Sequence, residues 1–186
     1  MTDCSRAWCA RLATVLVFSA AVAVLPGGVR RAAAIGVDAE CLLGTFNFTY
    51  TPALTATAGT IASESEYAYS CVLGPTSGAS AVTLTLPNFS CLNLLAGVPA
   101  HTEVVTWTGG TGDATSTIRY TSVMVTGQTG VLSGTVIAGR FNGDLAEKIL
   151  TTTGFSGTGI PLLCPIGLGT VGAASGTAIL TLVDPS

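Results

Sequence analysis

The chain has 186 residues, of which 48% are hydrophobic and 9% are charged, and its formal net charge is −3 at pH 7. This length is sufficient for one domain with a buried core. The negative balance and the small number of basic residues exclude binding to nucleic acid through a basic surface, because such a surface must neutralise phosphates.

The N-terminus has the pattern of an export signal. Two arginines precede an uncharged apolar stretch over residues 12–25, and the alanines at 32–34 offer a small-residue cleavage site. The apolar stretch is short for a membrane span, which needs roughly 20 residues. We predict a signal peptide over residues 1–34 that is cleaved after Ala34, with cleavage after Ala23 as the alternative.

Removal of this leader leaves a single domain over residues 35–186. It carries three cations against nine carboxylates, a net charge of −6. Without a basic patch, the domain is unsuited to nucleic acid and to an anionic membrane surface. We expect a secreted, extracellular protein that contacts no nucleic acid and, after signal cleavage, no membrane. Its expected partner is an extracellular protein or glycan.

Short runs of alternating apolar and polar residues follow one another through this domain. Period-two alternation with many threonines and valines is typical of strands, and the breaks between the runs combine Gly, Pro, Asn and Asp as turns do. The expected strands cover residues 44–50, 63–71, 80–86, 102–108, 116–126, 131–139, 147–153 and 176–183. Their number and spacing predict an all-β fold, a single antiparallel β-sandwich of about eight strands.

Glu64 and Glu66 are the first candidates for catalytic carboxylates. Two positions apart on a strand they share a face, with Cα atoms about 6.5–7 Å apart, a spacing that glycosidase carboxyl pairs also use. Their neighbours are serines and alanine, however, and no apolar pocket is present to raise a carboxyl pKa. We therefore place both glutamates on the solvent side of a strand, with Tyr67 and Tyr69 facing the core. A polysaccharide hydrolase that uses Glu64 with Glu66 or Glu103 is the alternative.

Four cysteines remain after the leader, and an even number in an exported chain predicts two disulfides. Of the three pairings that are open, we favour Cys41–Cys71 with Cys91–Cys164. No two of these cysteines are closer than 20 residues and His101 is the only histidine, so we expect neither a metal site nor a cofactor. We expect His101 to be solvated at the start of a strand.

The segment over residues 154–176 is rich in glycine and apolar residues and is long for a loop. Long ordered loops are often functional, so we treat it as a candidate binding surface. The candidate binding residues are Ile160, Leu162, Leu163, Ile166 and, if it is exposed, Trp107. The alternative is a crossover that is held by Cys164 and buries its apolar side chains over the open end of the core.

Two resemblances support this picture. The order Cys91, Trp107, Cys164 resembles that of immunoglobulin-like domains and implies a sandwich, although Leu162 stands where the tyrosine two residues before the second cysteine is expected. The segments GTFNFTYTPALT, YSC, SC and LLC…GTAILTL are similar to those of small secreted proteins of actinobacteria. That resemblance implies secretion and a disulfide-bonded sandwich, and implies no activity.

Together these observations favour a non-enzymatic extracellular protein that acts by binding or as a cell-surface or matrix component. The hydrolase described above is one alternative. A secreted inhibitor that presents a loop to another enzyme is a second, although no reactive-loop motif accompanies it.

Overall fold

A computed structural model describes residues 36–95, 99–126, 128–159 and 161–186. The predicted signal peptide over residues 1–34 lies outside the described residues. Within the described ranges, no helix is long and apolar enough to cross a membrane.

The described chain consists mainly of strands, which confirms the expected all-β class. All eight expected runs are strands, and each is longer than its pattern predicted. The strands are β1 (Gly36–Leu54), β2 (Gly59–Ser70), β3 (Ser77–Phe89), β4 (His101–Thr108), β5 (Thr115–Thr126), β6 (Thr129–Gly139), β7 (Leu145–Ser156) and β8 (Val171–Asp184). Two short 3₁₀ helices, η1 (Asn93–Leu95) and η2 (Pro161–Ile166), lie in the longest connections.

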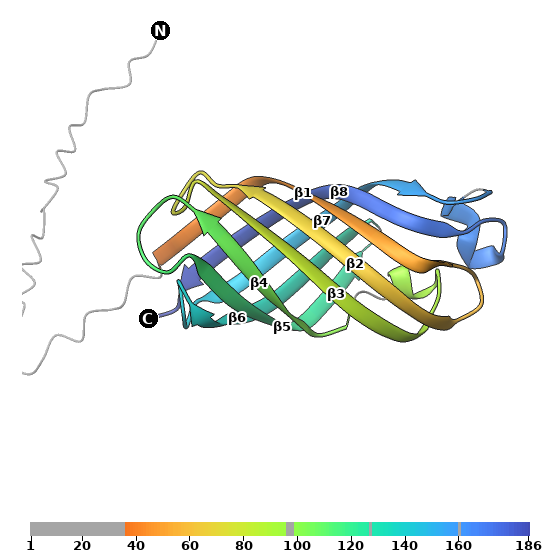
Figure 1. Ribbon diagram of the computed structural model, residues 1–186, viewed down its shortest axis with the longest axis horizontal. Coiled ribbons are helices and arrows are strands. Elements are labelled where there is room, and N and C mark those ends of the chain that lie inside the picture. The colour runs from red at the N-terminus through yellow and green to blue at the C-terminus, as the bar shows by residue number, and fades with distance from the viewer. Residues whose placement is uncertain (1–35, 96–98, 127, 160) are drawn as a thin grey trace, which may run out of the picture. The chain divides into compact units, whose positions relative to one another are not determined.

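The predicted sandwich, with its immunoglobulin-like architecture, is wrong. Each strand pairs antiparallel with the next, and β1 also pairs with β8, so the sheet closes into an eight-stranded barrel (Figure 1). A sandwich and a barrel both require strands with one apolar face, so alternation along the chain does not distinguish them. The difference lies in the pairing of the first strand with the last.

Closure of the barrel depends on irregular pairing and on glycine. The β1–β8 pairing shifts register at three places, one of them between Cys41 and Gly44, and such shifts bend a strand. Gly176 on β8 lies opposite Phe46, and a Cβ atom at Gly176 would lie 2.0 Å from the carbonyl oxygen of Thr151. Only a glycine allows β7, β8 and the Phe46 ring to approach this closely.

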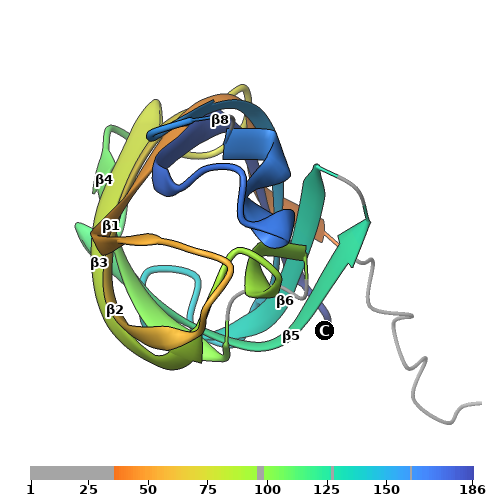
Figure 2. The same cartoon turned by 90° about the vertical axis from the view of Figure 1, so that its right-hand side faces the viewer.

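The barrel has two ends that differ in their connections. At the terminal end, β1 begins beside the end of β8, with Gly36 paired to Asp184, and three turns of five or six residues join the other strands. At the loop end lie the turns after β1 and β5 and the two long connections after β3 and β7. Figure 2 views the barrel from the loop end, where the segments that contain η1 and η2 lie across the opening.

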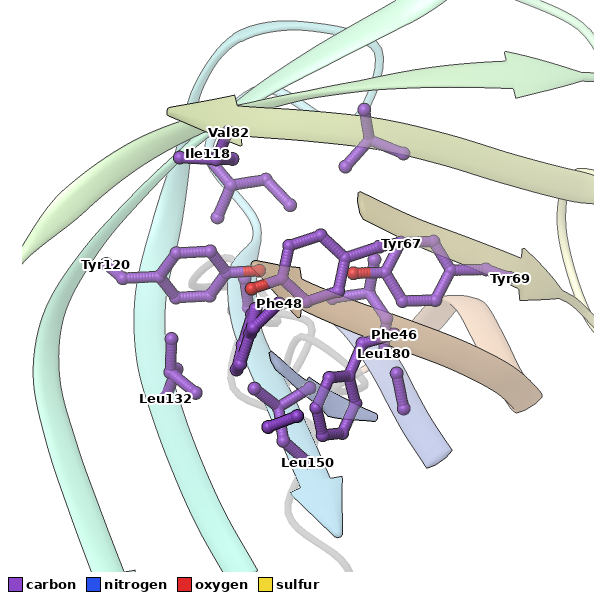
Figure 3. Packing of buried hydrophobic residues seen from close by; sticks show 14 of the residues in the cluster. Phe46, Phe48, Tyr67, Tyr69, Val82, Ile118, Tyr120, Leu132, Leu150 and Leu180 are labelled. Carbon is purple, nitrogen blue, oxygen red and sulfur yellow. The ribbon is translucent and has the colours of Figure 1, made fainter. Parts of the chain in front are cut away.

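Alternate residues of each strand point into the barrel and form one core. On β2, Tyr67 and Tyr69 are buried while Glu64 and Glu66 are exposed, so the predicted orientation of this strand is confirmed. Phe46 pairs with Tyr67 across β1 and β2. Figure 3 shows the aromatic rings of β1, β2 and β5 converging on the middle of the barrel.

The wall of the barrel is incomplete between β3 and β5 at the loop end. Only three residue pairs join β3 to β4, all near the terminal end, and β4 begins at His101 opposite Tyr120 of β5. The remainder of β3 and residues 121–126 of β5 therefore flank the connection that contains η1 instead of another strand. This is the part of the barrel where a cavity remains.

Candidate functional site

A cavity of about 340 Å³ lies inside the barrel at the loop end. Eight strands enclose an interior that side chains can just fill or that can hold one small ligand. Here the space is left by the gap between β3 and β5 and by the small side chain of Ala174 on β8. Its wall includes Phe46 and Phe48 of β1, Leu86 of β3 and Leu150 of β7.

The cavity lining is apolar, with a few neutral polar groups. None of the described residues that line it is charged. The polar side chains among them are Tyr50, Ser63, Ser65, Gln128, Thr129 and Thr152. Burial raises the pKa of Tyr50 well above its usual range, so its hydroxyl stays neutral. Such a cavity suits a neutral apolar molecule with one or two groups that can form hydrogen bonds.

The mouth of the cavity is formed by the connections at the loop end. Pro161, Leu162 and Pro165 of η2 and Leu94 of η1 line it, and the Leu162 side chain is also 65% exposed to solvent. Leu162 therefore belongs to the rim, with one side toward the cavity and the other toward the outside.

A disulfide ties these connections to one another across the mouth. Cys91, before η1, is bonded to Cys164 within η2. The backbone N–H of Cys91 donates to the carbonyl oxygen of Thr55 at 2.9 Å, which adds the turn after β1 to the same assembly. The second disulfide, Cys41–Cys71, lies at the terminal end. The favoured pairing of the four cysteines is thus confirmed.

Beneath the cavity, a buried ion pair joins opposite walls of the barrel. Lys148 of β7 donates from Nζ to Oε2 of Glu103 on β4, and both side chains are fully buried. Oε1 of Glu103 accepts hydrogen bonds from the hydroxyls of Tyr69, at 3.2 Å, and Ser80. The carboxylate is thus satisfied by three donors, as a buried charge requires.

Aromatic rings surround the Lys148 ammonium. Its Nζ lies 3.7 Å from the centre of the Tyr67 ring and 4.6 Å from that of Tyr120, which are cation–π distances. Burial lowers the pKa of Lys148, and the charge of Glu103 opposes that effect. Burial, reinforced by the Glu103 charge, raises the pKa of Tyr69 and of Tyr120 well above the usual range. The cluster therefore holds one buried positive and one buried negative charge among neutral hydroxyls.

The ion pair is separated from the cavity. Phe46, Phe48, Leu132 and Leu150 line the cavity floor, and neither Glu103 nor Lys148 is part of the lining. Glu64 and Glu66 lie on the outer wall, so the structure does not bring them together with Glu103. A substrate that filled the cavity would meet no carboxylate of the described lining.

The other residues singled out in the sequence are placed as follows. Trp107 is buried near the terminal end, where its Nε1 donates to Ser116 Oγ at 2.8 Å. It is therefore not exposed for binding, and it lies at the other end of the barrel from Cys91–Cys164.

His101 is 9% exposed and points inward, so the expectation of a solvated histidine is wrong. The reason is that His101 begins β4 on its inward face, with its ring 5.3 Å from that of Tyr120.

The 154–176 segment was expected to be either a binding surface or a crossover with buried apolar side chains, and it matches neither expectation completely. The connection does cover the open end of the barrel, and Cys164 is buried. Leu162, Leu163 and Ile166 are nevertheless exposed, so these apolar side chains are not part of the core. Ile160 lies outside the described residues.

Sequence reasoning missed Lys148 and the cavity-lining residues. A signal for Lys148 was present, because period-two alternation places it on the face of Ala146 and Leu150, just as Glu103 shares the face of Val105 and Trp107. A single lysine and a single glutamate at inward positions indicate a buried pair. The cavity had no such signal, because it depends on how distant strands diverge.

No family model, curated protein or solved structure matches this chain. Function is therefore inferred from the chain's own residues.

Proposed function

We propose that the protein binds a small, uncharged, apolar molecule in the barrel cavity. The observation that carries this proposal is an apolar cavity of about 340 Å³ with a mouth at one end and no charged residue in its described lining. An apolar pocket with a few converging polar groups is a usual place for a ligand.

The size and lining of the cavity limit the class of ligand. An apolar cavity of about 150 Å³ accommodates benzene, so this one has room for about two fused rings or a medium-length acyl chain. A carboxylate or phosphate group would find no cation in the described lining. A hydroxyl, carbonyl or ester group could bond to Tyr50, Ser63 or Gln128, which makes a neutral ligand the better fit.

The proposal specifies the binding role expected from the sequence. An extracellular setting agrees with the two disulfides, which persist in oxidising compartments. A carrier or sequestering protein requires no catalytic residue, in keeping with a cavity lining that contains hydroxyls and an amide but no described acid or base.

The test uses an uncharged fluorescent dye, N-phenyl-1-naphthylamine, with the exported, disulfide-bonded protein. We expect enhanced, blue-shifted fluorescence that saturates at one dye per chain. Ala174→Phe fills the cavity and should weaken dye binding more than about tenfold, since it displaces the buried ring of the dye. The matched control Ala68→Phe adds the same ring on the outer face of β2 and should leave affinity unchanged.

Absence of dye binding by the wild type would overturn the proposal, as would equal losses in both variants. Ligand binding also stabilises the fold: at a free dye concentration of about 100 times Kd, the expected gain is about 2.7 kcal/mol, visible as a higher Tm.

A further inference from the structure

The charges of the domain are absent from its loop end. Every Asp, Glu, Lys and Arg side chain after residue 35 belongs to the terminal end, the middle of the barrel or the outer wall. The segments that build the loop end contain none of these residue types: they are 50–60, 87–100, 120–132 and 149–170. A surface of this extent without charge is unusual for a protein surrounded only by water.

Apolar side chains project from the same end. Between 37% and 69% of each of six such residues is exposed. They are Leu92, Met124, Leu162, Leu163, Ile166 and Leu168. Four belong to η2 and its continuation, one follows Cys91, and one lies on β5 near its turn. They therefore surround the mouth of the cavity, whose rim includes Leu162.

The terminal end provides an internal comparison. It also exposes apolar residues, among them Leu43, Val72 and Leu73, but Asp38 and Glu40 accompany them. The terminal end is therefore apolar and acidic, whereas the loop end is apolar and uncharged. Exposed apolar groups that form a patch mark surfaces for interaction with proteins or membranes.

We propose that the loop end docks on an uncharged lipid surface and that the cavity takes up its ligand there. The inference rests on the proposed function of the cavity. An apolar ligand is scarce in water and concentrated in lipid, and the cavity mouth opens at the end that carries the exposed leucines. A second copy of the chain on this end would instead close the mouth. The absence of charge at this end matches a neutral headgroup layer, while the net charge of −6 disfavours an anionic one.

This proposal departs from the expectation of no membrane contact. That expectation was based on the missing basic patch, which excludes electrostatic attraction to anionic lipid. Insertion of leucine and isoleucine side chains into a neutral interface depends on apolar area and does not require cations.

Flotation with phosphatidylcholine vesicles tests the proposal. The protein is produced by export, with its N-terminus defined by intact mass, so that all variants share the same ends. We expect the wild type to float with the vesicles. Ile166→Ser combined with Leu168→Ser changes two exposed residues outside the cavity lining. This variant should lower the partition coefficient more than about tenfold, since each exposed aliphatic side chain that leaves water contributes roughly that factor. The control, Leu43→Ser with Val72→Ser at the terminal end, should float like the wild type.

Dye binding without vesicles separates this proposal from the previous one. The Ile166/Leu168 variant should lose vesicle binding and retain dye binding, whereas Ala174→Phe should lose dye binding and retain vesicle binding. Docking is overturned if the wild type does not float, if the terminal-end control falls equally, or if the same leucines support a dimer in size-exclusion chromatography without vesicle binding.

Discussion

Lys148 carries a positive charge inside the barrel. It is the only lysine of the chain, and its ammonium is fully buried between two tyrosine rings and Glu103. Taking two charges out of water is costly, and their attraction compensates only while both are present. Removal of one charge of the pair should therefore destabilise the protein more than removal of both.

Lys148→Met should lower the free energy of unfolding by about 3–5 kcal/mol, because Glu103 is then buried without a counter-charge. Addition of Glu103→Gln should recover at least about 2 kcal/mol, since the amide oxygen still accepts from Tyr69 and Ser80. Urea unfolding at pH 7 measures both changes. The control is Glu147→Gln, which alters the exposed neighbour on β7. A Lys148→Met loss below about 1 kcal/mol would contradict this account.

Asp144 introduces a pH dependence at the terminal end. Burial, together with the charges of Asp38 and Asp184, raises its pKa to about 6, and one carboxylate oxygen has no hydrogen-bond partner. Because this folded-state pKa exceeds the unfolded value of about 4, folding favours the protonated acid. The stability that it contributes is complete below about pH 4 and is lost as the pH rises through about 6.

Asp144→Asn should therefore stabilise the protein by about 1 kcal/mol at pH 7.5, a value reduced from the full linkage effect because solvent lies close to this turn. At pH 3.5 the variant and the wild type should unfold alike. Urea titrations at the two pH values measure the difference. Asp113→Asn makes the same charge change at an exposed turn residue and should leave the free energy of unfolding unchanged at both pH values. An equal gain at pH 7.5 in that variant would show that the change in net charge, and not the buried position of Asp144, is the cause.

At the scale of single strands, the sequence is a good guide. Alternation assigned Glu64 and Glu66 to the outside and Tyr67 and Tyr69 to the inside, because the two faces of a strand differ at every step. The burial of Lys148 and Glu103 as a pair was missed because charge normally indicates solvent. The apolar pattern of their neighbours had to be given more weight than their own polarity. The cysteine pairing was also accessible, since few combinations exist.

The Cys91–Cys164 disulfide holds together the two connections that form the mouth of the cavity. Its removal by paired serine substitutions should cost about 4 kcal/mol in the chain-entropy model for a separation of 73 residues. Removal of Cys41–Cys71, with a separation of 30, should cost nearly as much. Only the first change frees η2 from the loop beside η1, so only that variant should bind the dye more weakly. Chemical denaturation and dye titration separate the two effects, and equal affinities would contradict a role for this disulfide at the mouth.

At the scale of the whole molecule, the sequence was insufficient. Barrel closure depends on the pairing of β1 with β8, on register shifts such as that between Cys41 and Gly44, and on the close approach at Gly176. Each brings together residues far apart in the chain, so no local pattern reports it. The cavity has the same origin, since it exists because β4 begins only at His101 while β3 and β5 extend further.

Gly36 pairs with Asp184, so the first and last strands are neighbours in the barrel although no loop connects them. The strand pairs of the barrel do not depend on which of the connections between neighbouring strands is open. A circular permutant tests this independence. A linker of about six Gly and Ser residues should join Asp184 to Gly36, and new termini in the 109–114 turn should leave every strand pair intact. The rearranged chain should form both native disulfides and bind the dye like the parent. A chain reopened between Thr158 and Gly159 should also fold but bind the dye weakly, because that cut lies in the cover of the mouth. Peptide mapping and dye titration would show whether the order of strands along the chain is dispensable.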